Sequence, residues 1–209
     1  KIGVIGSNGT GESTLLKTIT GLIPPLSGDV RFGVKTRVGY FDQTIAATKS
    51  ELSVLEDFRA EFPELNDGEI RKTLGGFLLS GDDVFKCVKD LSGGEKVRLA
   101  LSKIFRRRPN FLILDEPTNH MDIIGKETLE KLLMDFSGTV IVVSHDRYLI
   151  NRVAKSLIVF EKGGVRYFDG TFDEYEEREK ETAEEVAKEK PKKTKKTGGE
   201  RYVESKEEA

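Results

Sequence analysis

The sequence has few of the features that mark secreted or membrane-spanning proteins. It holds one cysteine, Cys87, in 209 residues, so no disulfide can form within the chain, and this usage suits a reducing cytosol. Its longest apolar runs, such as 111–114 and 139–143, are strand-sized, far below the roughly 20 residues that cross a bilayer. The first residues alternate like a strand and lack the basic and apolar segments of a secretion signal. We therefore expect a cytoplasmic protein without a transmembrane segment.

Charged residues are distributed unevenly along the chain. Residues 172–209 hold 13 acidic and 10 basic side chains, whereas residues 1–171 hold 23 and 24. We expect a charged helix over 172–190, supported by pairs at i,i+4 such as Glu176 with Lys180, and a disordered tail after Pro191. A solvated tail is the simpler interpretation of its lysines at 192–196. Salt-sensitive contact of these lysines with RNA phosphates is the alternative.

Residues 1–171 alternate strands with helices. The expected strands cover 1–5, 37–42, 111–114, 139–143 and 157–161, with a short strand near Val30 and a hairpin from 157–161 into 165–168. The expected helices cover 13–19, 93–108, 125–136 and 147–154, and residues 52–88 are mostly helical. This alternation predicts an α/β fold with a mostly parallel sheet, whose ligands bind beyond the carboxyl ends of the strands.

A glycine-rich loop follows the first strand and opens the first helix. It reads Gly6-Ser7-Asn8-Gly9-Thr10-Gly11-Glu12-Ser13-Thr14 and matches the phosphate-binding pattern G-x-x-x-x-G-K-[ST] at every defined position except Glu12, where lysine is expected. In such a loop, backbone N–H groups converge on phosphate oxygens, and the Ser13 hydroxyl is available for Mg²⁺. A turn that merely joins a strand to a helix is the alternative.

Two carboxylates, Asp115 and Glu116, follow the apolar strand 111–114. Asp115 is placed to hold Mg²⁺, and Glu116 to orient or deprotonate an attacking water. His145 follows the strand 139–143 and reaches the same edge of the sheet if the strands are parallel. Taken alone, Asp115 and Glu116 are more simply interpreted as solvated acids, and His145 as a solvated loop histidine. Gln43 alone is more simply interpreted as an ordinary loop residue. Their convergence at several strand ends favours one functional site.

A second glycine-containing motif, Leu91-Ser92-Gly93-Gly94-Glu95, precedes an amphipathic helix. Ser92 and Glu95 have the spacing of a capping box, so helix initiation alone explains both polar residues. Capping does not require the glycine pair Gly93 and Gly94. Two glycines at a helix start permit close approach of an anionic ligand to exposed N–H groups.

In combination, these motifs resemble those of ATP-binding cassette (ABC) ATPases over about residues 1–171. The resemblance matches the Walker A loop to 6–14, the Q-loop residue to Gln43, the signature to 91–95, Walker B to 111–116, the D-loop to the vicinity of Asp122 and the switch histidine to His145. The segments 39–43 (GYFDQ) and 115–122 (DEPTNHMD) are most similar to the ABC-F branch. Members of that branch are soluble, carry two cassettes in one polypeptide and act on ribosomes.

The resemblance implies a sheet of the P-loop NTPase (RecA-like) type. The core would comprise 1–50 and 91–171, with a small helical subdomain at 51–90 and a charged extension at 172–209. The chain would be the second cassette of a longer protein, truncated at its N-terminus, so that the family's upstream aromatic platform for adenine is missing. The resemblance also implies partners: a second cassette that completes each nucleotide site, and the ribosome.

The same resemblance implies roles for individual residues, with ATP and Mg²⁺ as cofactors. Nucleotide would be bound by Gly6, Ser7, Asn8, Gly9, Thr10, Gly11, Glu12, Ser13 and Thr14, and the opposite site served by Ser92, Gly93 and Gly94. The expected Mg²⁺ ligands are Ser13, Asp115 and Gln43. The expected catalytic residues are Glu116, His145 and Gln43, of which the last two sense the γ-phosphate. The implied activity is ATP hydrolysis coupled to translation.

Glu12 departs from the family pattern. At about 4 Å and an effective dielectric constant of about 20, one pair of unit charges is worth roughly 4 kcal/mol. Glutamate in place of lysine should therefore weaken phosphate binding by one to several kcal/mol after relaxation. One alternative function is thus a non-catalytic cassette disabled by Glu12. Another is the ATPase subunit of a membrane transporter, which the short segment 51–90 and the pair Asn119-His120 disfavour.

Overall fold

The computed structural model describes residues 1–7, 9–46, 49–161 and 164–189. Asn8 of the glycine-rich loop and the lysines at 192–196 lie outside the described residues. The structure falls into two compact units, residues 1–175 and 176–209, which are described separately.

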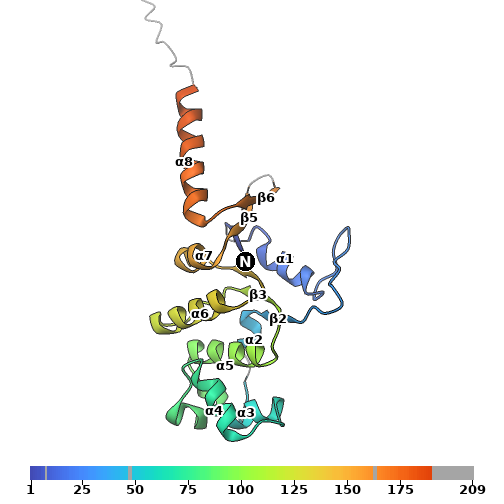
Figure 1. Cartoon of the computed structure of the whole chain (residues 1–209), viewed down its shortest axis with the longest axis vertical. Helices are drawn as coiled ribbons and strands as arrows, with labels where there is room; N and C mark the ends of the chain where they lie inside the picture. The colour runs from blue at the N-terminus through green and yellow to red at the C-terminus, as the bar shows by residue number, and fades with distance from the viewer. Residues whose placement is uncertain (8, 47–48, 162–163, 190–209) are drawn as a thin grey trace, which may run out of the picture. The chain divides into compact units, whose positions relative to one another are not determined.

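A sheet forms the centre of residues 1–175 (Figure 1). Its strands within the described residues are β1 (Ile2–Gly6), β2 (Val38–Phe41), β3 (Phe111–Asp115), β4 (Thr139–Val143), β5 (Ser156–Glu161) and β6 (Gly164–Asp169). Their order is β2-β3-β4-β1-β5-β6. Neighbouring strands are parallel except β5 and β6, which form the expected antiparallel pair. The prediction of an α/β fold with a mostly parallel sheet is confirmed.

Helices connect most of these strands. They are α1 (Glu12–Ile19), α2 (Gln43–Ala46), α3 (Val54–Glu61), α4 (Asp67–Gly75), α5 (Gly93–Arg106), α6 (Ile123–Asp135), α7 (Arg147–Val153) and α8 (Phe172–Glu189), with 3₁₀ turns at Gly81–Phe85 and Val88–Asp90. Figure 1 shows α1 on one side of the sheet and α5, α6 and α7 on the other. None of the helices in the described part of the chain is long and apolar enough to cross a membrane.

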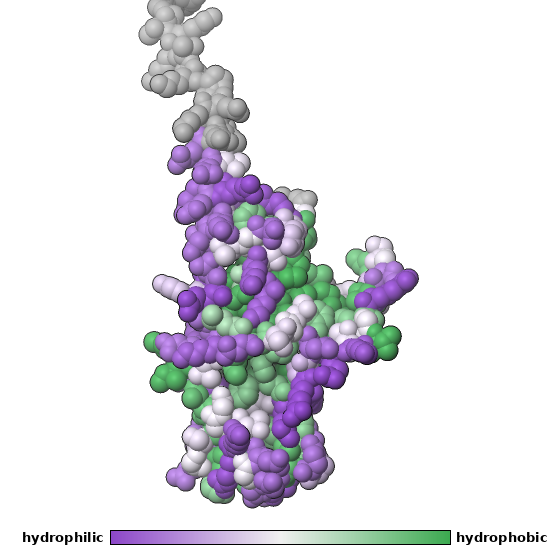
Figure 2. Space-filling model, in the orientation of Figure 1, coloured by the Kyte–Doolittle hydropathy of each residue, from purple (hydrophilic) through white to green (hydrophobic). Residues whose placement is uncertain are grey.

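The prediction of a short strand near Val30 is wrong. Residues between α1 and β2 follow an irregular path, because an isolated strand is unstable without a neighbour to pair with, and Val30 itself is 43% exposed. Apolar side chains are exposed along this stretch, and Figure 2 shows them at the surface beside α1. They belong to Leu22, Ile23, Leu26, Val30, Phe32 and Val34.

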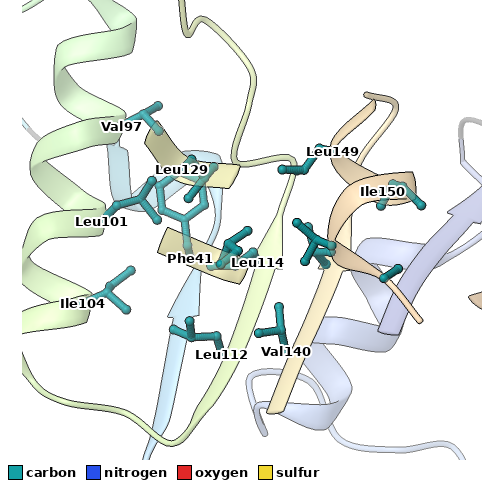
Figure 3. Packing of buried hydrophobic residues seen from close by; sticks show 14 of the residues in the cluster. Phe41, Val97, Leu101, Ile104, Leu112, Leu114, Leu129, Val140, Leu149 and Ile150 are labelled. Carbon is teal, nitrogen blue, oxygen red and sulfur yellow. The ribbon is translucent and has the colours of Figure 1, made fainter. Parts of the chain in front are cut away.

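Alternate residues of the central strands pack against opposite layers of helices, as the pleat of a strand requires. On one face, Leu112, Leu114 and Val140 meet side chains of α5, α6 and α7, such as Leu101 and Leu129 (Figure 3). On the other face, the adjacent strand residues pack with Leu16 of α1; they are Val4, Ile113, Ile141 and Val143. Burial on both faces fixes the register of the strands, and therefore the positions of the loops that follow them.

The helical region around α3 and α4 has an apolar cluster of its own. Apart from Leu99 of α5, the cluster draws on residues 54–91. Ion pairs link α5 to α3, since Lys103 Nζ lies 2.6 Å from an Asp57 oxygen and 3.2 Å from a Glu61 oxygen. The sheet and the helical region thus have separate cores.

In the second unit, the structure describes the remainder of α8. Its surface is mainly hydrophilic (Figure 2). Lys180 Nζ lies 3.9 Å from a Glu176 carboxylate oxygen, at the i,i+4 spacing expected from the sequence. The expected charged helix is therefore present over Phe172–Glu189.

Candidate functional site

Three loops meet at the carboxyl edge of the sheet. The glycine-rich loop follows β1, Asp115 ends β3 and His145 comes just after β4. Val4 of β1 is paired with Val143 of β4, which is paired in turn with Asp115. Because these three strands are adjacent and parallel, Gly6, Asp115 and His145 lie at one edge, which is where parallel sheets bind ligands.

The glycine-rich loop has the backbone geometry of an anion cradle. Gly9 and Gly11 adopt φ angles of 81° and 113°, in the left-handed region that favours glycine. A Cβ built on Gly6 would lie 2.7 Å from Phe160 Cβ and 2.5 Å from Glu12 Oε1, so a larger residue there would have to displace its neighbours. Gly11 caps α1 without a side-chain acceptor. The first N–H groups of α1 are therefore available to an anionic ligand.

Glu12 brings a negative charge into this cradle. It is the first residue of α1, is 8% exposed and turns its Oε1 over Gly6. Among the described residues, no ion pair involves Glu12. An acid in the first turn favours the helix itself, because the helix dipole is positive there. The same charge helps to raise the pKa values of Asp115 and Glu116.

Asp115 has the surroundings of a cation ligand. Burial is the main cause that raises its pKa, and a hydrogen bond donated by Ser13 opposes this rise. Asp42 and Glu12 raise the pKa further, whereas Lys17 lowers it. Crowded carboxylates with a hydroxyl beside them fit a hard cation such as Mg²⁺. Among the described residues, no three His, Cys, Asp or Glu side chains are grouped so that they could hold a metal ion together.

Glu116 and His145 face each other across the ends of β3 and β4. Glu116 has a φ of 50° and donates its backbone N–H to the Val143 carbonyl at 3.0 Å. Its Oε1 lies 3.5 Å from His145 Nε2 and is buried without a hydrogen-bond partner. Burial raises the pKa of Glu116, while the charge and backbone N–H of His145 oppose this rise. The unpaired oxygen could accept a hydrogen bond from water.

Gln43 begins α2, and its side chain is exposed. In the described part of the chain, no recorded contact joins it to Ser13 or Asp115. Its neighbour Asp42 is buried and accepts hydrogen bonds from Tyr40, Thr44 and the backbone of Ile45. Burial favours a higher pKa for Asp42, but these hydrogen bonds outweigh it and lower the pKa.

The signature turn begins α5, and its Ser92 and Gly93 are exposed. Ser92 and Glu95 form the expected capping box, with Ser92 N–H donating to Glu95 Oε2 at 2.7 Å. A Cβ on Gly94 would lie 2.6 Å from the carbonyl oxygen of His120, and one on Gly93 would lie 3.0 Å from His120 Cβ. Packing against His120 therefore explains the glycine pair without a ligand.

A cavity of about 480 Å³ opens beside the glycine-rich loop. Its polar lining includes Ser7, Glu12, His145 and Arg147, and its aromatic lining includes Phe160, Phe172 and Tyr175. The Arg147 guanidinium lies over the Phe172 ring, 5.3 Å from its centroid. The site thus offers room for a ligand next to Glu12 and His145.

Three further polar residues are buried at this edge: Asp42, Thr118 and Ser144. Thr118 Oγ1 and Ser144 Oγ lie 3.1 Å apart. Sequence patterns predict no role for these three residues, although each is within two positions of an assigned residue. Their contacts depend on the meeting of separate loops, which no local pattern reveals.

Comparison with known proteins finds a matching family model and relatives that are named as ATP-binding proteins. The family model described as "ABC transporter" matches residues 1–119. The ATP-binding protein YdiF of Bacillus subtilis is 48% identical over 87% of this chain and 28% of its own length. The ATP-binding cassette sub-family F member 3 of Mus musculus is 40% identical over 84% of this chain and 25% of its own length. The chain thus spans less than a third of either relative.

Solved structures share the fold. The RNase-L Inhibitor matches 87% of this chain and 36% of its own, with 27% identity and a TM-score of 0.66. The ATP-binding cassette MJ0796, in a dimeric post-hydrolysis state with ADP and Pi, matches 80% of this chain and 84% of its own, with 21% identity and the same TM-score. At that identity, the second likeness bears on the fold alone.

Proposed function

Because this chain belongs to the ATP-binding cassette family, we propose that it binds ATP at the loop 6–14 and takes part in its hydrolysis. The observation that carries the proposal is the convergence of this loop with Asp115, Glu116 and His145 at one edge of the sheet. ABC-F character is supported by the relative named for sub-family F and by the segments 39–43 and 115–122.

In this proposal, most residues act from the positions already described, whereas Gln43 makes no described contact with Ser13 or Asp115 and acts only once Mg²⁺ is bound. The backbone N–H groups at the start of α1 bind the phosphates. Ser13 and Asp115 hold Mg²⁺, with Gln43 as a further ligand, and Mg²⁺ when bound neutralises phosphate charge. The unpaired Oε1 of Glu116 accepts a proton or a hydrogen bond from the attacking water. His145, beside Glu116, donates to the γ-phosphate.

Turnover in this proposal requires a second cassette. The signature glycines pack on His120, and no described residue of the glycine-rich loop is among the nearest atoms to their Cβ positions. Ser92, Gly93 and Gly94 would therefore serve the nucleotide of the other cassette.

We also propose that this turnover acts on translation in the cytoplasm, through the ribosome. The ABC-F resemblance is the support for this step. Sedimentation of the tagged chain from a cell lysate, with and without ATP, tests it: recovery with ribosomes is the expected result. Recovery with membranes alone would contradict the ribosomal role and favour the ATPase subunit of a transporter.

A second candidate function is a non-catalytic nucleotide-binding cassette. The specific observation in its favour is the buried carboxylate of Glu12, which turns over Gly6 where phosphate oxygens would lie. Such a cassette would contribute its signature face to a partner and bind its own nucleotide weakly.

Three chains that differ only at residue 12 distinguish these functions. We expect Glu12→Lys to bind ATP–Mg²⁺ at least tenfold more tightly than the parent, and the neutral Glu12→Gln to fall between them, because roughly 1.4 kcal/mol corresponds to a tenfold change. Calorimetry measures the affinity, and phosphate release in the presence of a second cassette measures turnover. If the Glu12→Lys chain turns over ATP and the parent does not, the non-catalytic role of the parent is supported. Equal affinities for all three chains would contradict the electrostatic argument.

A further inference from the structure

Glu116 and His145 lie on two loops that begin where the pairing of β3 with β4 ends. The last paired residues of β3 and β4 are Asp115 and Val143. Beyond them, the Glu116 N–H donates to the Val143 carbonyl. The His145 side chain is 61% exposed, so its own packing fixes its position only weakly. The His145 backbone N–H bonds to the Glu116 carboxylate, and the position of the exposed His145 side chain depends further on the neighbours of the two residues.

A buried pair of hydroxyl groups bridges these loops. Thr118, two residues after Glu116, is 3% exposed, and Ser144, directly before His145, is 5% exposed. Their oxygens are 3.1 Å apart. Ser144 Oγ also accepts the Asp146 N–H at 3.1 Å. Because a buried hydroxyl without a partner is unfavourable, each of the two groups holds the other in place.

The residue on the other side of His145 is anchored as well. Asp146 caps α7 by accepting the Leu149 N–H at 3.3 Å. Its other oxygen lies 2.8 Å from Lys126 Nζ of α6. His145 is thus held between Ser144, which is tied to the loop of Glu116, and Asp146, which is tied to α6.

The loop of Glu116 needs such support. Glu116 and His120 have φ angles of 50° and 65°, an unfavourable conformation for residues other than glycine. Within the loop, Met121 N–H donates to the Thr118 carbonyl at 3.2 Å. The Thr118 hydroxyl reaches out of the loop to Ser144, so it couples a strained segment to a neighbouring strand end.

We infer that Thr118 and Ser144 are positioning residues that hold His145 at its distance from Glu116. The purpose of this placement rests on the proposed function, since hydrolysis needs both groups at one phosphate. The placement itself is a property of the folded chain without nucleotide. The inference therefore has a test that does not depend on ATP turnover.

The test follows the ring of His145 by NMR. The chain has two histidines, so the His145 ring signals are assigned by their loss in His145→Gln. Thr118→Val keeps the branched shape of threonine without its hydroxyl, and Ser144→Ala removes the other partner. We expect both variants to shift and broaden the His145 ring signals, and Thr118→Ser, which keeps a hydroxyl, to restore them.

Ser102→Ala is the matched control. Ser102 is fully buried, and its hydroxyl donates to the Leu99 carbonyl within α5 at 2.7 Å. We expect this variant to lower the unfolding temperature without moving the His145 signals. If Thr118→Val and Ser144→Ala do the same, their hydroxyls serve stability alone and the inference is overturned. Should Thr118→Val fail to fold, Ser144→Ala and Thr118→Ser decide the matter.

A second readout concerns turnover. In Glu12→Lys chains with a second cassette, we expect Thr118→Val to lower kcat at least tenfold and leave the KM for ATP unchanged. A change in KM alone would overturn the positioning role. If the Glu12→Lys chain with Thr118 intact shows no turnover, the proposed function is contradicted instead. The NMR result would still decide whether the hydroxyl pair positions His145.

Discussion

Carboxylates dominate the site at the scale of single residues. Glu12 and Asp115 both raise the pKa of Glu116, in addition to the larger effect of burial. A cation or a proton would relieve this crowding. Burial of like charges near a strand end is unfavourable for folding, so it identifies positions where stability is given up for binding.

Substitution of Glu116 should stabilise the chain in a pH-dependent manner. Because burial raises the pKa of Glu116 in the folded chain, the stability that its protonated form contributes is complete below the unfolded-state pKa and is lost as the pH rises through the folded-state pKa. We expect Glu116→Gln to unfold at a higher temperature than the parent at pH 8, by roughly 2–4 °C for each kcal/mol gained. The difference should vanish near the ordinary pKa of glutamate, about 4.3.

Thermal melts without divalent cations measure this effect. Glu127→Gln serves as the control, because Glu127 is exposed on α6 and its substitution should change little at either pH. A Glu116→Gln chain that is equally stabilised at pH 4 and pH 8 would show that the gain does not come from ionisation.

At the scale of the elements, the start of α5 depends on its capping box. Burial favours a higher pKa for Glu95, but hydrogen bonds from Ser92 and Lys86 outweigh it and lower the pKa to about 2. The ionised form therefore contributes stability above the unfolded-state pKa, which is lost as the pH falls through the folded-state value. We expect Glu95→Gln to cost about 1 kcal/mol at pH 7 and progressively less as the pH falls.

Urea unfolding of the parent and Glu95→Gln chains, compared at pH 7 and pH 3, measures this change. Taking the difference between the two chains cancels the titration of other carboxylates. An undiminished difference at pH 3 would mean that Glu95 acts through packing instead of its charge.

The signature glycines should be intolerant of a side chain even without nucleotide. A Cβ on Gly94 meets the backbone of His120 at 2.6 Å, so α5 or the 116–122 loop must move. We expect Gly94→Ala to lower the free energy of unfolding by about 1–3 kcal/mol. Gly75 in α4 has nothing within 4 Å of its Cβ position, and Gly75→Ala should stabilise the chain by up to about 1 kcal/mol. Denaturant titration tests both, and equal effects would contradict the packing argument.

At the scale of the whole molecule, the pattern of strands and helices could be predicted because periodicity and glycine or proline breaks are local. The motifs at strand ends could also be placed at one edge, since parallel strands share a direction. Contacts between distant segments could not be predicted. Thr118 and Ser144 are 26 positions apart, and the glycine pair at 93–94 meets His120 through folding alone. The prediction of a strand near Val30 is wrong because a local sequence pattern does not show whether a neighbouring strand is available for pairing.

The requirement for a second cassette can be tested by mixing two inactive chains. One carries Glu116→Gln and the other Ser92→Arg, both in the Glu12→Lys background. Each dimer of identical chains lacks a working site, whereas a mixed dimer has one site with an intact Glu116 and an intact opposite Ser92. With random pairing of symmetric dimers, we expect the mixture to recover roughly a quarter of the parent turnover. A mixture as inactive as its components would contradict the shared-site arrangement.

The separate core of the helical region has a consequence for amide hydrogen exchange. Most buried apolar residues of 54–91 pack among themselves and with Leu99 of α5, apart from Phe77, which packs in the core beside the sheet, so this region can open locally while the strands stay protected. Deuterium uptake should then occur in two stages, with the amides of α3 and α4 exchanging together before those of β1, β3 and β4. A partner that bridges α3 and α5 would slow the first stage and leave the second unaltered.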